Sequence, residues 1–414
     1  MISEDLYQSV LQAVDKDEIL ELVRTLVMIP SHWANTGREK EIAKKLKEIF
    51  DHEGIESYLQ EVIDGRENVI ASLKGTGGGR SLMLNGHIDT VPPFGMEDPF
   101  SAQIQNGVLH GRGSADMKSG VGTMAYALII LNRLGIKLKG DLIFAGVIDE
   151  DAASSKGSRH LIQHGPTTDA AIVGEPTLLH PVAAHKGIDY FEVEFKGKSA
   201  HSSAPEIGVN AIYAAACFIH TIQNELIPAY SQLNHPLVGA PTINVGLIQG
   251  CAQGNKPFLL GESDTFAGTV PDNCKVYIDI RWNPDQTIEQ VTEDVRKAAE
   301  SVKRTMSNIE VNVNYIPMPR PPMEIDSNHD LVQIASKHLR HILGHNQEVK
   351  GVNFWADSGL LYGLGGIPTL LLGPGDISYA HSDKESIEIS QLVPAVILYV
   401  LTALEFCGFE ETYE

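Results

Sequence analysis

The sequence has few cysteines, few basic residues and no long apolar run, and each shortage argues against a class of protein. Its four cysteines (Cys217, Cys251, Cys274 and Cys407) include no CxxC pair. A disulfide framework or a cysteine-based metal site is therefore not expected, and a reducing cytoplasm fits. Lysine and arginine number 32 against 53 aspartate and glutamate residues, giving a net charge of −21. Nucleic acids and anionic membranes bind basic faces, so we expect neither as a partner.

Signals for membrane insertion and secretion are missing as well. No segment approaches the roughly 18 consecutive apolar residues that a membrane-spanning helix needs. The first residues, MISEDLYQSV, are acidic from position 4 and lack the basic start and apolar centre of a signal peptide. With 414 residues, the chain exceeds the size at which one hydrophobic core stops growing, so we expect two domains.

The expected helices and strands divide the chain into a main domain and an insertion. Up to residue 186 they alternate, which is typical of an α/β domain with a mainly parallel sheet. Residues 187–316 follow the order βαββαβ, which makes a self-contained, ferredoxin-like α+β unit. Helices and strands resume after the proline-rich segment PMPRPPM at 317–323. We therefore predict an α/β domain formed by residues 1–186 and 317–414, interrupted by a smaller domain at residues 187–316.

A glycine run, GTGGG at residues 75–79, separates two of the expected strands. Glycine-rich loops can cradle phosphate groups, but such loops lead into a helix and carry a GK[ST] signature. Here the run leads into the strand that begins at Leu82, and no such signature follows. We therefore predict a hairpin turn.

The stretch SLMLNGHIDTV at residues 81–91 carries the clearest chemical signal. An apolar run ends there and presents His87 and Asp89, which project from the same face of a strand because they are two residues apart. A histidine that binds a metal usually donates its other ring N–H to a carboxylate, and Asp89 is placed to accept it. A polar turn at the end of a strand would explain the motif equally well.

Four further segments place an acid or a histidine just after an expected helix or strand. Asp116 lies in GRGSADMKSG, Glu150 and Asp151 follow LIFAGVI, Glu175 follows AAIVG, and His381 follows LLLGPGDISYA. Each alone is also typical of a solvated turn. Ligands of open α/β sheets gather at the carboxyl ends of the strands, however, so these side chains could converge there.

Such a set of nitrogen and oxygen donors suits Zn²⁺, with Co²⁺ and Mn²⁺ as alternatives. Five ligands are more than one tetrahedral zinc needs. If one carboxylate bridges, five ligands suit two cations and leave positions open for water. One acid then remains as a general base, which should not itself be a ligand.

Seven motifs, in this order, resemble those of a known family. It is the acetylornithine deacetylase, succinyl-diaminopimelate desuccinylase, aminoacylase and glutamate carboxypeptidase family of dinuclear zinc amidohydrolases. The matching segments are GHIDTVPP, GRGSADMKSG, IDEDAASSKG, VGEPT, KSAHSSAPEIGVNAI, YIDIRW and GPGDISYAHSDKESI. The resemblance implies that His87 and Glu175 bind one zinc, that Asp151 and His381 bind the other, and that Asp116 bridges the two. It also implies a cis peptide bond after Asp116.

The resemblance further implies roles outside the ligand set. Asp89 would orient His87, and Glu150 would be the general base for attack by a hydroxide that bridges the metals. The inserted domain would be a lid and the interface of a homodimer, from which His201 stabilises the oxyanion and Arg281 binds a substrate carboxylate. The backbone of Gly373 and Gly375 would line the substrate pocket. Judged without the family, His201 is an ordinary turn histidine and Arg281 an exposed arginine at a strand end.

Three features depart from the family's pattern. The second of its paired glutamates is Asp151 here, so that ligand is one methylene shorter. Its asparagine about thirteen residues before the lid arginine is replaced by Gly268. The connection from Cys251 to Gly268 is longer than usual.

The resemblance also bears on the substrate. The family's acylase and carboxypeptidase branches tend to have glutamate at the position of Glu175, and Arg281 suits a substrate with a free α-carboxylate. We therefore predict metal-dependent deacylation of an N-acyl amino acid, in the manner of acetylornithine deacetylase or succinyl-diaminopimelate desuccinylase. A carboxypeptidase or dipeptidase acting on short peptides is the alternative within the family. A non-catalytic metal-binding homologue is the alternative from another class, and the retained Glu150 argues against it.

Overall fold

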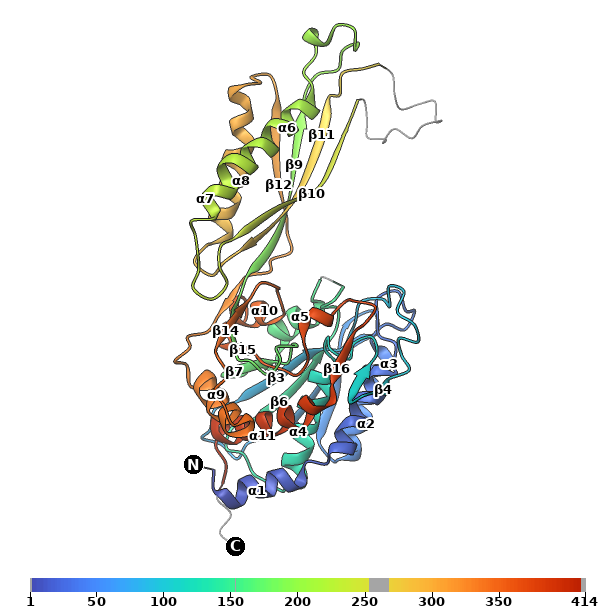
Figure 1. Ribbon diagram of the computed structural model, residues 1–414, viewed down its shortest axis with the longest axis vertical. Helices are drawn as coiled ribbons and strands as arrows, with labels where there is room; N and C mark the ends of the chain where they lie inside the picture. Colours follow the sequence, from blue (N-terminus) through green and yellow to red (C-terminus); the bar gives the residue numbers. More distant parts are fainter. Residues whose placement is uncertain (1, 153, 253–267, 411–414) are drawn as a thin grey trace. The chain divides into compact units, whose positions relative to one another are not determined.

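The computed structural model describes residues 2–152, 154–252 and 268–410, which form two compact units (Figure 1). The large unit comprises Met1–Ala184, Met323–Gly351 and Ala356–Glu414, and the small unit comprises His185–Pro322 and Val352–Trp355.

The small unit extends past residue 316, where we placed its end. Arg320 belongs to it because its carbonyl accepts the N–H of Ile188 at 3.0 Å, and Trp355 joins it because its indole Nε1 donates to the Pro321 carbonyl at 3.0 Å. Residues 317–322, which we assigned to the α/β domain, therefore belong to the small unit.

The large unit is built on a nine-stranded sheet with a parallel centre. Eight of its strands run in the order β1-β2-β6-β3-β7-β15-β8-β13, and β14 pairs with β8. The pairs β6–β3, β3–β7 and β7–β15 are parallel, whereas β1–β2, β2–β6 and β15–β8 are antiparallel. The bounds are β1 (Glu56–Ile63), β2 (Arg66–Leu73), β3 (Leu82–His87), β6 (Leu142–Val147), β7 (Ala170–Val173), β8 (Val182–His185), β13 (Met323–Glu324), β14 (Lys350–Val352) and β15 (Thr369–Leu371). The predicted α/β class with a mainly parallel sheet is confirmed.

Helices cover both faces of this sheet, which explains why its central strands β3, β6 and β7 are mostly apolar and fully buried. On one face α4 packs on β3 and β6, α3 packs on β1 and β2, and α11 packs on α4; α5 and α10 lie against the other face (Figure 1). The helices are α1 (Glu4–Ala13), α2 (Lys16–Val27), α3 (Lys40–His52), α4 (Lys118–Arg133), α5 (Lys156–His164), α9 (Asp330–Leu343), α10 (Ser358–Gly363) and α11 (Leu392–Cys407). A three-stranded sheet, β16-β5-β4, is formed by β4 (Gln103–Gln105), β5 (Val108–His110) and β16 (Ser386–Glu388).

Helix α11 departs from our expectation about apolar segments. With the turn before it (Ile389–Cys407), it is long and apolar enough to cross a membrane by length and composition alone. In the structure 72% of this window is buried, and the helix packs against α4 and α9. Its apolar residues therefore serve the core of the large unit.

The glycine run does not form the predicted hairpin. Strands β2 and β3 lie on opposite sides of β6 and pair with it separately. The run instead lies against the chain at Lys139–Gly140. A Cβ on Gly75 would meet the Lys139 carbonyl oxygen at 2.4 Å, and one on Gly79 would meet the Cys407 carbonyl oxygen at 2.0 Å. Only glycine permits this close approach of backbones.

The small unit is a four-stranded antiparallel sheet with helices on one face. Its strand order is β10-β11-β9-β12, which is ferredoxin-like, and alternate residues of β9 (Phe191, Val193 and Phe195) are buried against the helices. The elements are β9 (Gly187–Lys196), α6 (Ala211–Thr221), α7 (Ile227–Tyr230), β10 (Thr242–Cys251), β11 (Asn273–Trp282), α8 (Ile288–Glu300) and β12 (Glu310–Ile316). Most of the long connection between β10 and β11 that we singled out lies outside the described residues.

Candidate metal centre

The candidate metal ligands lie at the carboxyl ends of the parallel strands in the large unit. His87 is the last residue of β3, Asp151 follows β6 by four residues, and Glu175 follows β7 by two. Asp116 comes from the loop before α4, and His381 from the loop after β15. Adjacent parallel strands end at the same edge, so the chain needs only short loops to bring these side chains together.

The five side chains contact one another around Asp116. Its Oδ1 lies 2.9 Å from His87 Nε2, and its Oδ2 lies 3.2 Å from His381 Nε2. His381 Nε2 is also 2.9 Å from Asp151 Oδ1, and His87 Nε2 is 3.8 Å from Glu175 Oε1. Asp116 thus has one oxygen toward each histidine, and the contacts divide the five residues into the two sets that the family resemblance implies. The Asp116–Met117 peptide bond is cis.

The charges of the centre favour a cation. Burial opposes protonation of His87, but Asp116, Glu175 and Asp151 outweigh it and raise the pKa of His87 well above its ordinary value. Hydrogen bonds to Asp116 and Asp151 raise the pKa of His381 to about 10. The carboxylates around His87 and His381 therefore favour positive charge at this place in the protein. Nitrogen and oxygen donors of this kind fit Zn²⁺, Co²⁺ or Mn²⁺, and His87, Asp116 and Asp151 each offer a ligand atom within 4.8 Å of the others.

These pKa shifts predict that the metal-free protein loses stability as the pH rises. Because His381 binds its proton more tightly in the folded state, its contribution is complete below the unfolded pKa of about 6.5 and is lost by about pH 10. Burial raises the pKa of Glu150 and of Glu175, which acts in the same direction. Thermal unfolding of chelator-treated protein between pH 6 and 10 measures this, and His381→Ala should flatten the decline. A midpoint that rises over this range would contradict it.

Asp89 supports the centre in a different way from the one we predicted. The Nδ1 of His87 donates to the backbone carbonyl of Asp89 at 3.0 Å, whereas the nearer carboxylate oxygen, Oδ1, lies 3.7 Å away, beyond hydrogen-bonding distance. The carboxylate instead accepts the backbone N–H groups of Glu150 at 3.0 Å and Ala152 at 3.3 Å. Asp89 therefore fixes His87 through its backbone and fixes the Glu150 loop through its side chain.

Two more contacts hold the loop that carries Glu150 and Asp151. The Oδ2 of Asp151 accepts the N–H of Val91 at 2.9 Å, which leaves Oδ1 for the centre. Asp149, in the left-handed region at φ 72°, accepts a hydrogen bond at 2.6 Å from the partly buried guanidinium of Arg66. Asp151, which is one methylene shorter than the family's glutamate, is thus held by the backbone N–H of Val91, shortly after His87.

Glu150 has the properties of a general base. Burial raises its pKa well above its ordinary value, and the charges of Asp357 and Glu175 add to the rise, while His87 opposes it. A carboxylate with a raised pKa accepts a proton at neutral pH more readily than an ordinary one. We did not predict Asp357, which is fully buried with its Oδ2 2.5 Å from Ser158 Oγ. Asp357 directly precedes α10, a usual place for aspartate at a helix start, and no other feature of the sequence singles it out.

His201 and Gly268 lie side by side in the small unit. Residues 201 and 269 form an isolated bridge, and Ser202 N–H donates to the Gly268 carbonyl at 2.6 Å. His201 is exposed, and its Nδ1 accepts the N–H of Ser203 at 3.2 Å. The same Nδ1 also lies 2.7 Å from Ser203 Oγ, so among the described contacts Ser203 engages Nδ1 and Nε2 is the nitrogen left for a ligand.

Arg281 lies near the end of β11, also in the small unit, with Thr242 of β10 and Ile188 of β9 as its strand neighbours. About a third of its side chain is exposed, and its Nε lies 3.9 Å from Asp279 Oδ1. Burial and the charge of Arg281 both lower the pKa of Lys186, whose Nζ donates to the Ala240 carbonyl at 2.5 Å.

Gly373 and Gly375 have partners for their N–H groups inside the protein. The Gly373 N–H donates to Thr177 Oγ1 at 3.1 Å, and the Gly375 N–H donates to Gln391 Oε1 at 2.9 Å. A Cβ on Gly373 would meet the Glu175 carbonyl oxygen at 2.6 Å. Gly373 therefore lets two strand ends approach closely beside Glu175, and its N–H is not available to a substrate.

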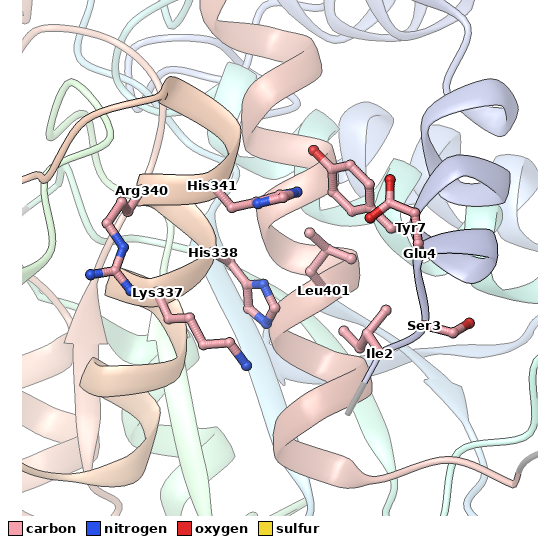
Figure 2. Close-up of a pocket in the computed structure, with 9 residues that line it drawn as sticks. All are labelled: Ile2, Ser3, Glu4, Tyr7, Lys337, His338, Arg340, His341 and Leu401. Atoms are coloured by element: carbon pink, nitrogen blue, oxygen red, sulfur yellow. The ribbon is translucent and has the colours of Figure 1, made fainter.

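A separate cavity of about 480 Å³ lies between α1, α9 and α11 (Figure 2). It is lined mainly by Tyr7 and the start of α1, by basic residues of α9 such as Lys337 and Arg340, and by Leu401. None of the candidate residues lines it, so it is not the site described above.

Two imidazoles and three carboxylates in contact form a candidate metal centre of the kind that a metal-dependent hydrolase needs. The sequence model of peptidase family M20/M25/M40 matches residues 83–405, which include every residue of the centre. The chain belongs to this family of metal-dependent hydrolases of amide bonds.

Two relatives match nearly the whole chain. Acetylornithine deacetylase of Shigella sonnei is 32% identical over 403 residues, covering 94% of this chain and 97% of its own. N-formyl-4-amino-5-aminomethyl-2-methylpyrimidine deformylase of Halalkalibacterium halodurans is 28% identical over 434 residues, covering 95% of each. The crystal structure of aminopeptidase PepT from Bacillus cereus has a similar fold, with a TM-score of 0.76 at 22% identity, covering 95% of this chain and 99% of that one.

Proposed function

We propose that this protein is a deacylase that hydrolyses an N-acyl amino acid to a carboxylate and a free amino acid. The observation that carries amide hydrolysis is the contact of His87 and His381 with opposite oxygens of Asp116, next to the raised-pKa Glu150. The partly exposed guanidinium of Arg281 suits a substrate with a free carboxylate. The 32% identity with an acetylornithine deacetylase supports this substrate class.

Each residue of the centre has a separate role in the proposed reaction. His87, Asp116, Asp151, Glu175 and His381 would hold two Zn²⁺ ions, which supply Lewis-acid polarisation of the carbonyl and an activated water when bound. Glu150 accepts the proton of the attacking water at its carboxylate and returns it to the departing amine. For His201 and Arg281 of the small unit, the family resemblance implies the roles of oxyanion donor and carboxylate partner.

Arg281→Ala is expected to weaken substrates with a free carboxylate and to spare those without one. Loss of a charge-assisted contact should raise KM about tenfold or more for an N-acetyl amino acid, with a small effect on the corresponding amide. Steady-state kinetics on both substrates measure the difference. Arg296→Ala, which removes an exposed arginine paired with Glu293 on α8, is the matched control. Equal losses on both substrates would contradict a carboxylate contact.

A substrate panel with metal removal tests the proposed function. We expect release of amino acid from N-acetylornithine, N-succinyl-diaminopimelate or other N-acyl amino acids, loss of activity with EDTA, and recovery with Zn²⁺ or Co²⁺. Turnover of dipeptides, with every acyl substrate inert, would instead identify a peptidase of the same family. Absence of hydrolysis by the metal-loaded protein would favour the non-catalytic alternative.

We further propose a homodimer formed through the small unit. β10 is an edge strand of its sheet, and it exposes Leu247 and Ile248 to about half of their surface. An exposed edge with apolar side chains is a template for pairing with a second chain. Sedimentation equilibrium should give twice the monomer mass, and a monomer at micromolar concentration would contradict the proposal.

A further inference from the structure

A buried arginine–glutamate pair lies directly behind Asp116. Arg112 and Glu385 are fully buried, and Arg112 Nη1 donates to Glu385 Oε2. The other oxygen of Glu385, Oε1, accepts the backbone N–H of Ala115 at 3.1 Å and of Asp116 at 3.0 Å. Glu385 follows His381 by four residues, so its carboxylate joins the segment of one candidate ligand to the backbone of another.

The guanidinium of Arg112 makes further contacts to backbone. Its Nη2 donates to the carbonyl of Ser382 at 3.0 Å and to that of Pro93 at 3.3 Å. Ser382 is the residue after His381, and Pro93 lies in the segment that follows β3 and carries Asp89. Arg112 therefore connects three of the segments that form the centre.

A buried ion pair is not the arrangement that stabilises a protein core most. Removing two charges from water costs free energy that their attraction often only offsets, and apolar replacements of similar volume are frequently as stable. A role in stability alone therefore does not explain this pair. Its hydrogen bonds end instead on the backbone next to two metal ligands, where a small displacement would alter the coordination.

We propose that Arg112 and Glu385 are positioning residues that set the separation and orientation of Asp116 and His381 for two cations. Glu385 fixes the backbone from which the Asp116 carboxylate projects, and Arg112 fixes the backbone beside His381. The two oxygens of Asp116 can face both halves of the ligand set only while these backbones keep their places. This inference rests on the proposed dinuclear centre. Partners beyond the ligands typically change metal affinity by about 10–100-fold.

Zinc titration of the metal-free protein tests the pair without relying on activity. Glu385→Gln keeps the shape of the side chain and removes the charge that faces Arg112. We expect at least one of the two Zn²⁺ ions to bind about tenfold more weakly, and the absorption spectrum of the Co²⁺ form to change. Glu53→Gln is the matched control, because Glu53 forms a two-contact pair with Arg133 at 2.9 and 2.7 Å outside the centre. Its affinities should stay within about twofold of the wild type.

A second variant decides the case if Glu385→Gln fails to fold. Arg112→Lys keeps a positive charge beside Glu385 but cannot reproduce the forked contacts to Ser382 and Pro93. We expect a folded protein whose second Zn²⁺ binds about tenfold more weakly. Wild-type affinity for both ions in a folded variant would overturn the proposal. Wild-type protein that binds two Zn²⁺ ions but hydrolyses no acyl substrate would overturn the proposed function and leave this inference standing.

Discussion

Glu150→Gln is expected to lower kcat by about 10²–10⁴-fold while both metal ions remain bound. The amide cannot accept a proton from the attacking water, and general acid–base catalysis contributes a factor of this size. In the described part of the chain, the contacts that hold the ligand set together join the two histidines to Asp116, Asp151 and Glu175, not to Glu150. The metal content, measured by atomic absorption, should therefore stay at two per chain.

The stability of the variant provides the control for this prediction. The pKa of Glu150 is raised in the folded protein, so the folded state holds the proton more tightly and its ionisation at neutral pH opposes folding. A neutral glutamine removes that penalty. The metal-free Glu150→Gln protein should unfold at the same temperature as the wild type, or higher, at pH 7. Turnover close to that of the wild type would remove Glu150 from the mechanism.

The predictable part of the centre is the part that directly follows buried strands. His87, Asp151 and Glu175 come within four residues of the ends of β3, β6 and β7, which are fully buried and mostly apolar. Apolar runs of that length predict buried parallel strands, and parallel strands end at a common edge. The position of these residues therefore follows from local pattern and a topological rule.

The supporting contacts could not be predicted, because they depend on how loops approach one another. Glu385 is 273 residues from Arg112 and stands in the charged string SDKES, which looks like exposed surface. Asp89 has the spacing expected of a histidine partner, yet its carboxylate turns toward Glu150 because the loop after β6 brings two N–H groups closer. The local sequence around Glu385 and Asp89 does not indicate which loops these side chains will contact.

The glycine run at 75–79 shows that the pairing of strands also could not be predicted from local sequence. The motif indicated a turn, but whether β2 and β3 would pair depended on a third strand 60 residues later. β6 forms between them because it offers a fully apolar partner to both. Local turn signals predict a change of direction, and they do not determine which strands become neighbours.

Asp116→Asn is expected to reduce metal content from two ions to one or none and to lower kcat/KM by about 10⁴-fold or more. The carboxylate is the only side chain seen to contact both His87 and His381 in the described residues. Asparagine has the same size but turns an N–H₂ group toward one histidine, where it cannot act as a ligand. Metal analysis after dialysis and the substrate panel measure both effects.

The matched control for this variant is Asp376→Asn, in the loop that leads to His381. The Asp376 carboxylate accepts only the local N–H of Ser378, at 2.9 Å, among its described contacts. Its loss should leave metal content at two and activity within about twofold of the wild type. In Asp116→Asn the pKa of His381 should also fall, because Asp116 is the largest cause of its rise to about 10. The decline in stability of the metal-free protein with rising pH should then be shallower. Two tightly bound ions in Asp116→Asn would mean that another group bridges them.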